Sequence, residues 1–375
     1  MKLFIVTLVL LLVLLSGVLP NQIKKSYYFC LALFLGIIAY FIYPNSSLDL
    51  KYWFDNMFAV RNYDIGYFFQ TDLFRQVPVF ALFLFWVSKT GIYGLLQGTS
   101  VFITYLSVFL MIRQESKKQH FSKFVELSLM LAAMMILNYV TAVSGMRISL
   151  ASSIFIYFLY NDLRNNKSFL KCIPFYVVAC LVHNSIMLLL VFRFLIFLYQ
   201  KNSFFKNLIR VLLLTWTLLK ELLIFVMDNI NIYYFQITAY KLQSYTNELM
   251  ETIANVRLYT FVALTLLVIL IIIYLKYKKI IKNNSKNFLS CGDNYNAYIE
   301  ILIFFLIGSI FEYNIFTRYV EILFKMMIVI IGNLFLCVQP NFSLKKLNIY
   351  YIILIVEAIL YFIFYYFGQL NLIYF

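Results

Sequence analysis

Long apolar runs recur along almost the whole chain, separated by short polar segments. Many of them approach the roughly 20 residues that a helix needs to cross about 30 Å of hydrocarbon. Hydrophobic residues make up 63% of the 375 residues, against roughly 45–50% in soluble domains. A soluble globule of this size could not bury so much apolar surface in one core. The sequence therefore predicts that lipid surrounds most of the chain.

The apolar runs predict an all-α fold, a polytopic transmembrane bundle of about 12 spans. The first run lacks the cleavage pattern of a signal peptide and is predicted to remain as a span. The whole chain, 1–375, is expected to form a single integral membrane domain. The predicted spans lie near residues 3–20, 27–43, 91–112, 121–143, 147–160, 172–184, 185–199, 208–227, 257–275, 296–311, 319–338 and 347–367.

One apolar segment, near 77–88, is too short to cross and is predicted to be a re-entrant or interfacial helix. If it does not cross, nearly all the basic loops fall on one side, which the positive-inside rule makes cytoplasmic. The acidic residues in those loops are Glu115, Asp162 and Asp293. Both termini and two long segments, about 44–90 and 228–256, are then predicted to lie outside a plasma membrane that the chain crosses many times.

The net charge of +15 does not indicate nucleic-acid binding, because the basic residues lie in short tracts between apolar runs. The five cysteines are scattered and include no CxxC pair, so the sequence predicts neither a metal site nor a disulfide. There is also no glycine-rich phosphate loop in the short cytoplasmic segments, and no cofactor is expected.

Polar residues at the predicted outer ends of the spans are the candidates for chemistry. Asp64 could act as a general base or bind a sugar hydroxyl, or it could belong to a solvated loop. Arg147 is not explained by the positive-inside rule, and its planar fork suits phosphate oxygens. His183, predicted near the same face, could shuttle a proton or could be a turn residue satisfied by backbone. Arg318 is a second outer arginine.

Further charges within apolar runs are interpreted as structural. The neighbours Lys220 and Glu221 must point in different directions on a helix. Glu321 and Lys325 are spaced i, i+4 and could pair on one helix face. The tyrosines of 228–256 could stack on sugars, but aromatic residues make up 20% of the whole chain, so an interfacial aromatic belt explains them better.

Several segments together carry a resemblance to a known family. They are Arg61–Tyr67 with its pattern Asp64-Ile65-Gly66-Tyr67, Pro78–Gly91, Ser144–Ala151, the basic loop up to Lys171, Leu181–Ser185 and, more weakly, Thr317-Arg318-Tyr319. Over roughly residues 50–200, the chain resembles the EpsG-type family of Wzy-like polysaccharide polymerases. One departure concerns the residue after Arg147, which is often glutamine in the family and is Ile148 here.

The resemblance implies polymerisation of undecaprenyl-diphosphate-linked oligosaccharide repeats at the outer face of a bacterial plasma membrane. The product would be an O-antigen, a capsule or an exopolysaccharide. In this reaction the growing chain moves from its lipid diphosphate to a hydroxyl of the next repeat. Arg147 and Arg318 would neutralise the departing diphosphate, and His183 or Asp64 would be the base. Contacts to the sugars would come from Arg61, Tyr67 and Tyr319.

The partners implied are the lipid-linked oligosaccharide, membrane lipid and a chain-length regulator protein, without nucleic acid, metal or cofactor. Two alternatives remain open. One is another membrane glycosyltransferase or ligase that uses the same lipid donor. The other is a flippase or transporter of the lipid-linked oligosaccharide, a class that often contains internal repeats. No clear repeat relates the two halves of this sequence, which favours an enzyme.

Overall fold

The computed structural model describes residues 2–17, 19–43, 49–137, 139–230, 243, 253–283 and 292–338. These residues form helices joined by turns, with no strand among them, which confirms the all-α fold. Within the described ranges, three helices are long and apolar enough to cross a membrane, at Leu95–Gln119, Thr260–Ile281 and Tyr313–Leu336. The total of about 12 spans stays a prediction. The last predicted span, 347–367, and most of the segment 228–256 lie outside the described residues.

The chain divides into two compact units. The first contains Met1–Met187 and Ile328–Phe375, and the second contains Leu188–Met327. The single membrane domain expected over 1–375 stays a prediction.

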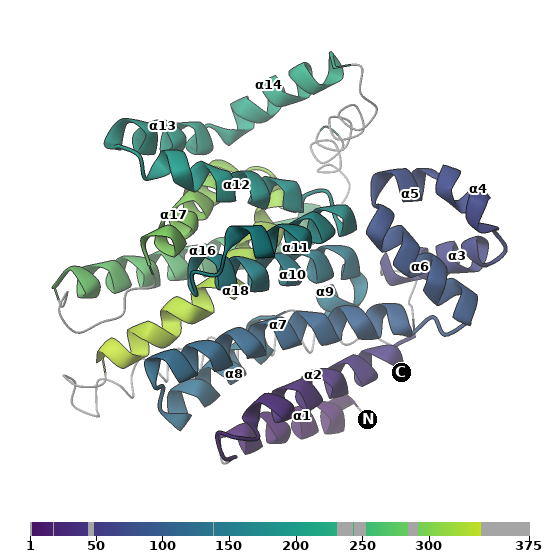
Figure 1. The fold of residues 1–375 in the computed structure, drawn as a ribbon, viewed down its shortest axis with the longest axis horizontal. Helices are drawn as coiled ribbons and strands as arrows, with labels where there is room; N and C mark the ends of the chain where they lie inside the picture. The colour runs from purple at the N-terminus through teal and green to yellow at the C-terminus, as the bar shows by residue number, and fades with distance from the viewer. Residues whose placement is uncertain are drawn as a thin grey trace. The chain divides into compact units, whose positions relative to one another are not determined.

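Four helices of the first unit lie side by side: α1 (Lys2–Ser16), α2 (Lys24–Tyr40), α7 (Leu95–Gln119) and α8 (Lys123–Ile136) (Figure 1). The α2 and α7 backbones approach closely at Gly36 and Gly98, where a Cβ on Gly36 would come within 2.7 Å of the Gly98 carbonyl oxygen. Small residues at a helix crossing are typical of membrane helices, which gain stability from close backbone packing.

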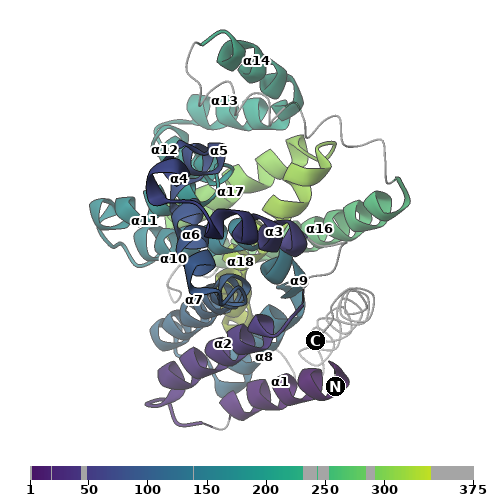
Figure 2. The same ribbon diagram turned by 90° about the vertical axis from the view of Figure 1, so that its right-hand side faces the viewer.

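Four short helices form a group that precedes α7: α3 (Asp49–Arg61), α4 (Ile65–Gln70), α5 (Asp72–Gln76) and α6 (Pro78–Thr90) (Figure 2). The predicted outer segment 44–90 is therefore helical from Asp49 onward. Helix α6 has proline at its first position and is followed by Gly91, whose φ of 73° disfavours other residues. Its 13 residues span roughly 20 Å, less than the hydrocarbon thickness of about 30 Å. The short helix predicted near 77–88 is confirmed.

The predicted span 121–143 consists of two helices, α8 and α9 (Tyr139–Ser144), rather than one. Donors from α7 satisfy carbonyl groups around the break, since the Tyr105 hydroxyl donates to the Leu137 carbonyl at 2.9 Å and the Ser100 hydroxyl donates to that of Ala142 at 3.0 Å. Two further helices follow, α10 (Met146–Leu163) and α11 (Phe169–Val182), and α10 packs against both α7 and α11.

In the second unit, the predicted span 208–227 is also divided, into α13 and α14, by Thr215. The Thr215 hydroxyl donates back to the Val211 carbonyl at 3.0 Å, a bond that weakens or bends a helix. Helix α13 packs against α17. The helices that lie wholly or partly in this unit are α12 (Ile186–Tyr199), α13 (Ser203–Leu214), α14 (Trp216–Asp228), α16 (Ile253–Asn283), α17 (Asp293–Gly308) and α18 (Tyr313–Val338).

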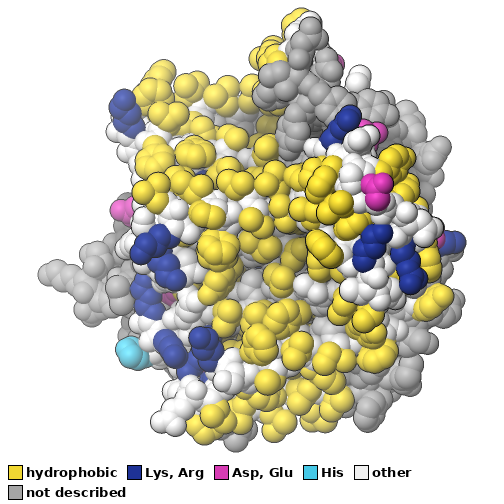
Figure 3. Space-filling view, turned by 45° about the vertical axis from the view of Figure 1, so that its right-hand side comes forward, with side chains coloured by type: hydrophobic (Ala, Val, Ile, Leu, Met, Phe, Trp, Pro, Cys, Tyr) yellow, Lys and Arg dark blue, Asp and Glu magenta, His cyan; other side chains and the backbone are white. Residues whose placement is uncertain are grey.

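Large apolar side chains cover much of the face that Figure 3 shows. On α1 and α2 they include Leu11, Leu14, Leu15, Phe29, Leu33 and Ile37. Exposed apolar area of this extent marks a surface that contacts lipid or protein. It agrees with the membrane character that the composition predicts.

Candidate functional site

Arg147 is held against two aromatic rings of the first unit. Its guanidinium carbon lies 4.4 Å from the centre of the Trp53 ring and 5.7 Å from that of Phe80. Both rings are buried, on α3 and α6, whereas Arg147 itself is half-buried. A planar guanidinium stacks well on aromatic faces, so the two rings fix the place of this positive charge.

The local sequence brings Arg147 to the first turn of α10. Helix α9 ends at Ser144, Gly145 has φ −79° and ψ 41°, and α10 begins at Met146. The first turn of a helix has backbone N–H groups without intrahelical partners and carries the positive end of the helix dipole. That end disfavours an arginine and favours an anion. The aromatic contacts therefore hold Arg147 at a position where a negatively charged group would be stabilised.

His183 caps the end of α11, the neighbour of α10. Only a short turn joins these two packed helices, so they run antiparallel and the start of α10 and the end of α11 lie at the same end of the pair. The ring Nδ1 of His183 accepts the Ser185 backbone N–H at 3.2 Å and lies 2.7 Å from the Ser185 hydroxyl. In the neutral ring the proton is then on Nε2. Accepting a substrate proton at Nδ1 would require the Ser185 contacts to open.

Asp64 is the N-cap of α4. Its Oδ1 accepts the backbone N–H of Tyr67 at 2.6 Å, and its own backbone is extended, with φ −75° and ψ 165°. Within the Asp64-Ile65-Gly66-Tyr67 pattern, the first and last residues are therefore joined by the hydrogen bond that caps α4. The Asp64 side chain is exposed. A catalytic role for this carboxylate stays a prediction.

An Asp64→Asn variant separates these two roles. Asparagine caps a helix as well as aspartate does, so we expect stability within about 0.5 kcal/mol of the wild type, whereas Asp64→Ala should cost about 1 kcal/mol. Thermal unfolding of the purified protein measures both. Asparagine cannot act as a general base, so loss of polymer in a well-folded Asp64→Asn variant would identify Asp64 as the base. Full activity would exclude that role.

Arg61 and Tyr67 flank Asp64 and are both exposed. Arg61 lies at the end of α3, with its Nη1 3.4 Å from the Tyr93 hydroxyl, and its carbonyl accepts the Lys89 ammonium at 2.7 Å. The Tyr67 ring packs edge-to-face on that of Tyr63, with 4.8 Å between their centres. Contacts of Arg61 and Tyr67 to sugars stay a prediction.

Arg318 and Tyr319 belong to the second unit, in the N-terminal part of α18. Arg318 is half-buried. The Tyr319 ring is buried and lies edge-to-face against Phe305, with 5.2 Å between the ring centres, so it faces the protein. Because these residues and Arg147 lie in different units, a site that they share stays a prediction.

Buried carboxylates form a set of interactions that the sequence did not reveal. In the first unit, Glu126 accepts Lys24 and the Tyr28 hydroxyl, both at 2.7 Å, and the Ser116 hydroxyl at 3.1 Å. Glu115 accepts Arg164 and Tyr160. The only signal in the sequence is that single acids stand among basic residues. It does not tell which distant cation each acid meets.

The second unit contains similar pairs. Glu300 on α17 accepts the Tyr199 hydroxyl at 2.6 Å and Arg210 at 3.1 Å, and it also pairs with Lys278. Buried Lys220 pairs with Glu312 at 2.7 Å, whereas its neighbour Glu221 is largely exposed.

Two expectations concern these charges. Glu321 pairs with Lys325 at 3.1 Å, as the i, i+4 spacing predicted. Lys220 is buried and Glu221 is exposed, as expected for neighbours with different surroundings, although their charged atoms lie 4.0 Å apart. Within the described ranges, no group of three or more His, Cys, Asp or Glu could hold a metal ion.

No protein-family model matches the chain, and comparisons with curated proteins and with solved structures found no match.

Proposed function

We propose that the chain is an integral membrane glycosyltransferase that polymerises undecaprenyl-diphosphate-linked oligosaccharide repeats at the outer face of a bacterial plasma membrane. The observation that carries the proposal is Arg147, held on Trp53 and Phe80 at the first turn of α10. An arginine positioned in this way suits a diphosphate, whose oxygens accept paired hydrogen bonds from the planar fork.

The direction of α7 supports an outer location for Arg147. Its 25 residues, at about 1.5 Å each, make α7 roughly 37 Å long, enough to cross hydrocarbon of about 30 Å. Ser100, near the start of α7, donates to the carbonyl of Met146, which precedes Arg147. The basic residues Arg113 and Lys117 lie near its other end. With the basic end cytoplasmic, Arg147 faces outward. With this orientation of α7, we propose that the chain crosses the membrane about 12 times and that both termini lie outside.

The proposed reaction moves the growing chain between two oxygen atoms. A hydroxyl of the incoming repeat attacks the anomeric carbon of the growing chain, and the bond from that carbon to the diphosphate oxygen breaks. Arg147 neutralises the departing diphosphate, with Arg318 as a second cation. His183 or Asp64 accepts the hydroxyl proton. Binding of the sugars is assigned to Arg61, Tyr67 and Tyr319.

The proposal is tested in cells by the length of the surface polysaccharide. In Arg147→Ala and Arg318→Ala variants, we expect long polymer to disappear while single repeats still reach the surface, because the flipping of each repeat across the membrane does not need this chain. Gel analysis of the extracted polysaccharide and surface labelling of single repeats measure the two outcomes.

Normal polymer length in both variants, with normal protein levels in the membrane, would contradict the proposal. Repeats that accumulate only on the cytoplasmic leaflet would instead assign the chain as a flippase. Chains that grow normally but fail to reach a final acceptor would assign it as a ligase that uses the same donor.

A further inference from the structure

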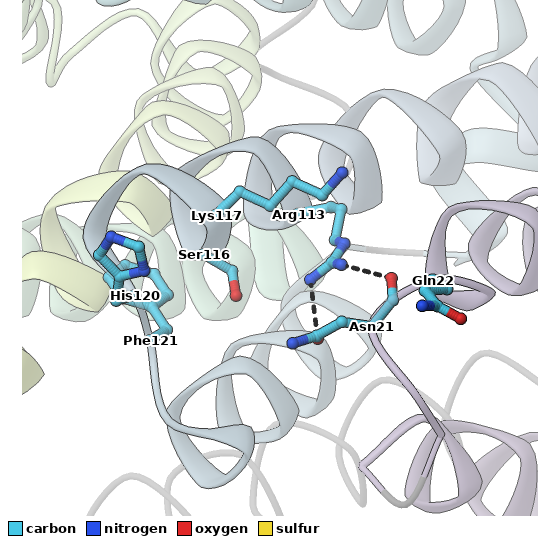
Figure 4. Close-up of a pocket in the computed structure, with 7 residues that line it drawn as sticks. All are labelled: Asn21, Gln22, Arg113, Ser116, Lys117, His120 and Phe121. Atoms are coloured by element: carbon cyan, nitrogen blue, oxygen red, sulfur yellow. Dashed lines mark hydrogen bonds between the residues drawn. The ribbon is translucent and has the colours of Figure 1, made fainter.

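A second polar site lies at the other end of α7 from Arg147. It is a hollow of about 590 Å³ between the end of α7 and the turn that joins α1 to α2 (Figure 4). Its lining combines basic, polar and aromatic side chains: Asn21, Gln22, Arg113, Ser116, Lys117, His120 and Phe121.

Arg113 is the buried cation of this hollow, with 4% of its surface exposed. Its Nη2 donates to the Asn21 carbonyl at 2.7 Å, and its Nη1 lies 3.4 Å from both the Asn21 side chain and Glu126. Its Nε is buried and has no hydrogen-bond partner in the part of the chain that the structure describes. A buried donor without an acceptor is costly, and an anion nearby would stabilise the positive charge of this guanidinium.

The charges around the hollow do not cancel. Glu126 is shared by two buried cations, Lys24 at 2.7 Å and the more distant Arg113 at 3.4 Å. One carboxylate neutralises one of them, so a positive charge remains. Exposed Lys117 adds a second positive charge on the lining, beside His120. A buried surplus of positive charge carries a large desolvation cost unless an anion compensates it.

The helix dipole explains only part of this arrangement. Basic residues are favoured in the last turn of a helix, which accounts for Lys117. Arg113 lies almost two turns before the end of α7, beyond the reach of that effect. The carbonyl of Ser116 is already satisfied by the backbone N–H groups of His120 and Phe121. The buried guanidinium therefore calls for another explanation.

Exposed apolar side chains in the α1–α2 turn, which lines the hollow, and near the end of α1 indicate the source of the anion. Ile23, next to Gln22 in the α1–α2 turn, is exposed, and so are Leu14 and Leu15 near the end of α1. A free phosphate would gain nothing from these residues, whereas acyl chains would cover them. We propose that the hollow binds the headgroup phosphate of an anionic membrane lipid, with Arg113 and Lys117 as its cationic groups. This site is independent of the polymerase proposal.

Native mass spectrometry of the full chain in detergent tests the site, with equal amounts of phosphatidylglycerol and phosphatidylcholine that carry the same acyl chains. We expect the wild type to retain phosphatidylglycerol preferentially. Lys117→Gln should lower that preference about fivefold, since each basic group near an anionic lipid contributes on the order of a fivefold change in affinity. The matched control is Lys171→Gln, another exposed lysine of the first unit that lies outside the hollow.

Equal losses in the two variants would overturn the proposal, because the preference would then come from diffuse surface charge. Equal retention of the two lipids by the wild type would overturn it as well. A third measurement replaces lipid with inorganic phosphate and records the melting temperature. Stabilisation by phosphate that requires Lys117, without retention of phosphatidylglycerol, would assign the site to a soluble phosphate and overturn the lipid assignment.

Discussion

Replacing Glu115 by glutamine is expected to destabilise the first unit by about 3–5 kcal/mol, the usual cost of removing one partner from a buried ion pair. The Glu115 side chain is 1% exposed and that of Arg164 is 3% exposed. Arg164 donates through Nε at 3.1 Å and through Nη2 at 2.5 Å, one bond to each carboxylate oxygen. Without the carboxylate, the guanidinium would stay buried with no countercharge in this contact.

The loss of stability in Glu115→Gln should be large because the Glu115 side chain joins three helices. It also accepts the Tyr160 hydroxyl at 2.9 Å and the Asn333 amide at 3.0 Å. These partners come from α10 and from the part of α18 that belongs to the first unit. Networks of this kind depend on every member being satisfied, and glutamine replaces one of the two acceptor oxygens with an NH2 group that cannot accept these donors.

Equilibrium unfolding in detergent measures the change in free energy. The matched control is Glu221→Gln, at a side chain that is 68% exposed and lies 4.0 Å from its lysine, where we expect a change within about 0.5 kcal/mol. Removing both charges together, with Glu115→Leu and Arg164→Met, should destabilise less than Glu115→Gln alone. A Glu115→Gln variant no less stable than Glu221→Gln would show that the pair does not hold these helices together.

The local features of this fold were predictable from sequence because they depend on near neighbours. Apolar runs located most of the longer helices, although not α3, α4 and α5, and the short run between Arg75 and Lys89 gave the helix α6. The i, i+4 spacing of Glu321 and Lys325 predicted their ion pair. Each of these depends on residues within one or two helical turns.

The long-range features were not predictable, because they depend on how distant helices pack. Glu115 contacts Asn333, 218 positions away, and Glu126 contacts Lys24, 102 positions away. The divided span 121–143 depends in the same way on Tyr105 and Ser100 of α7. Sequence identified Arg147 as a candidate, but not the two rings that hold it, since Trp53 and Phe80 lie on separate helices.

Arg147→Ala is expected to lower the rate of chain joining by about 10²–10³-fold, the usual effect of removing one group that stabilises developing charge. The proposed role further requires that the shape of the cation matters. Arg147→Lys keeps the charge but loses the planar fork and its stacking on Trp53. We therefore expect its rate of chain joining to lie between the rates of the wild type and the alanine variant. Trp53→Leu keeps the arginine and removes one of its cation–π contacts, which should lower the rate of chain joining only about fivefold.

The rates are measured with purified protein and lipid-linked repeats, separating kcat from KM. Removing a group that acts on the departing diphosphate should lower kcat, whereas removing a group that only binds substrate should raise KM. Arg75→Ala is the matched control, because Arg75 is an exposed arginine of α5 that the proposal does not use. If Arg147→Ala behaved like Arg75→Ala, the first turn of α10 would have no part in the chemistry. If Arg147→Lys kept the full rate, a point charge would suffice, and the aromatic contacts would only stabilise the fold.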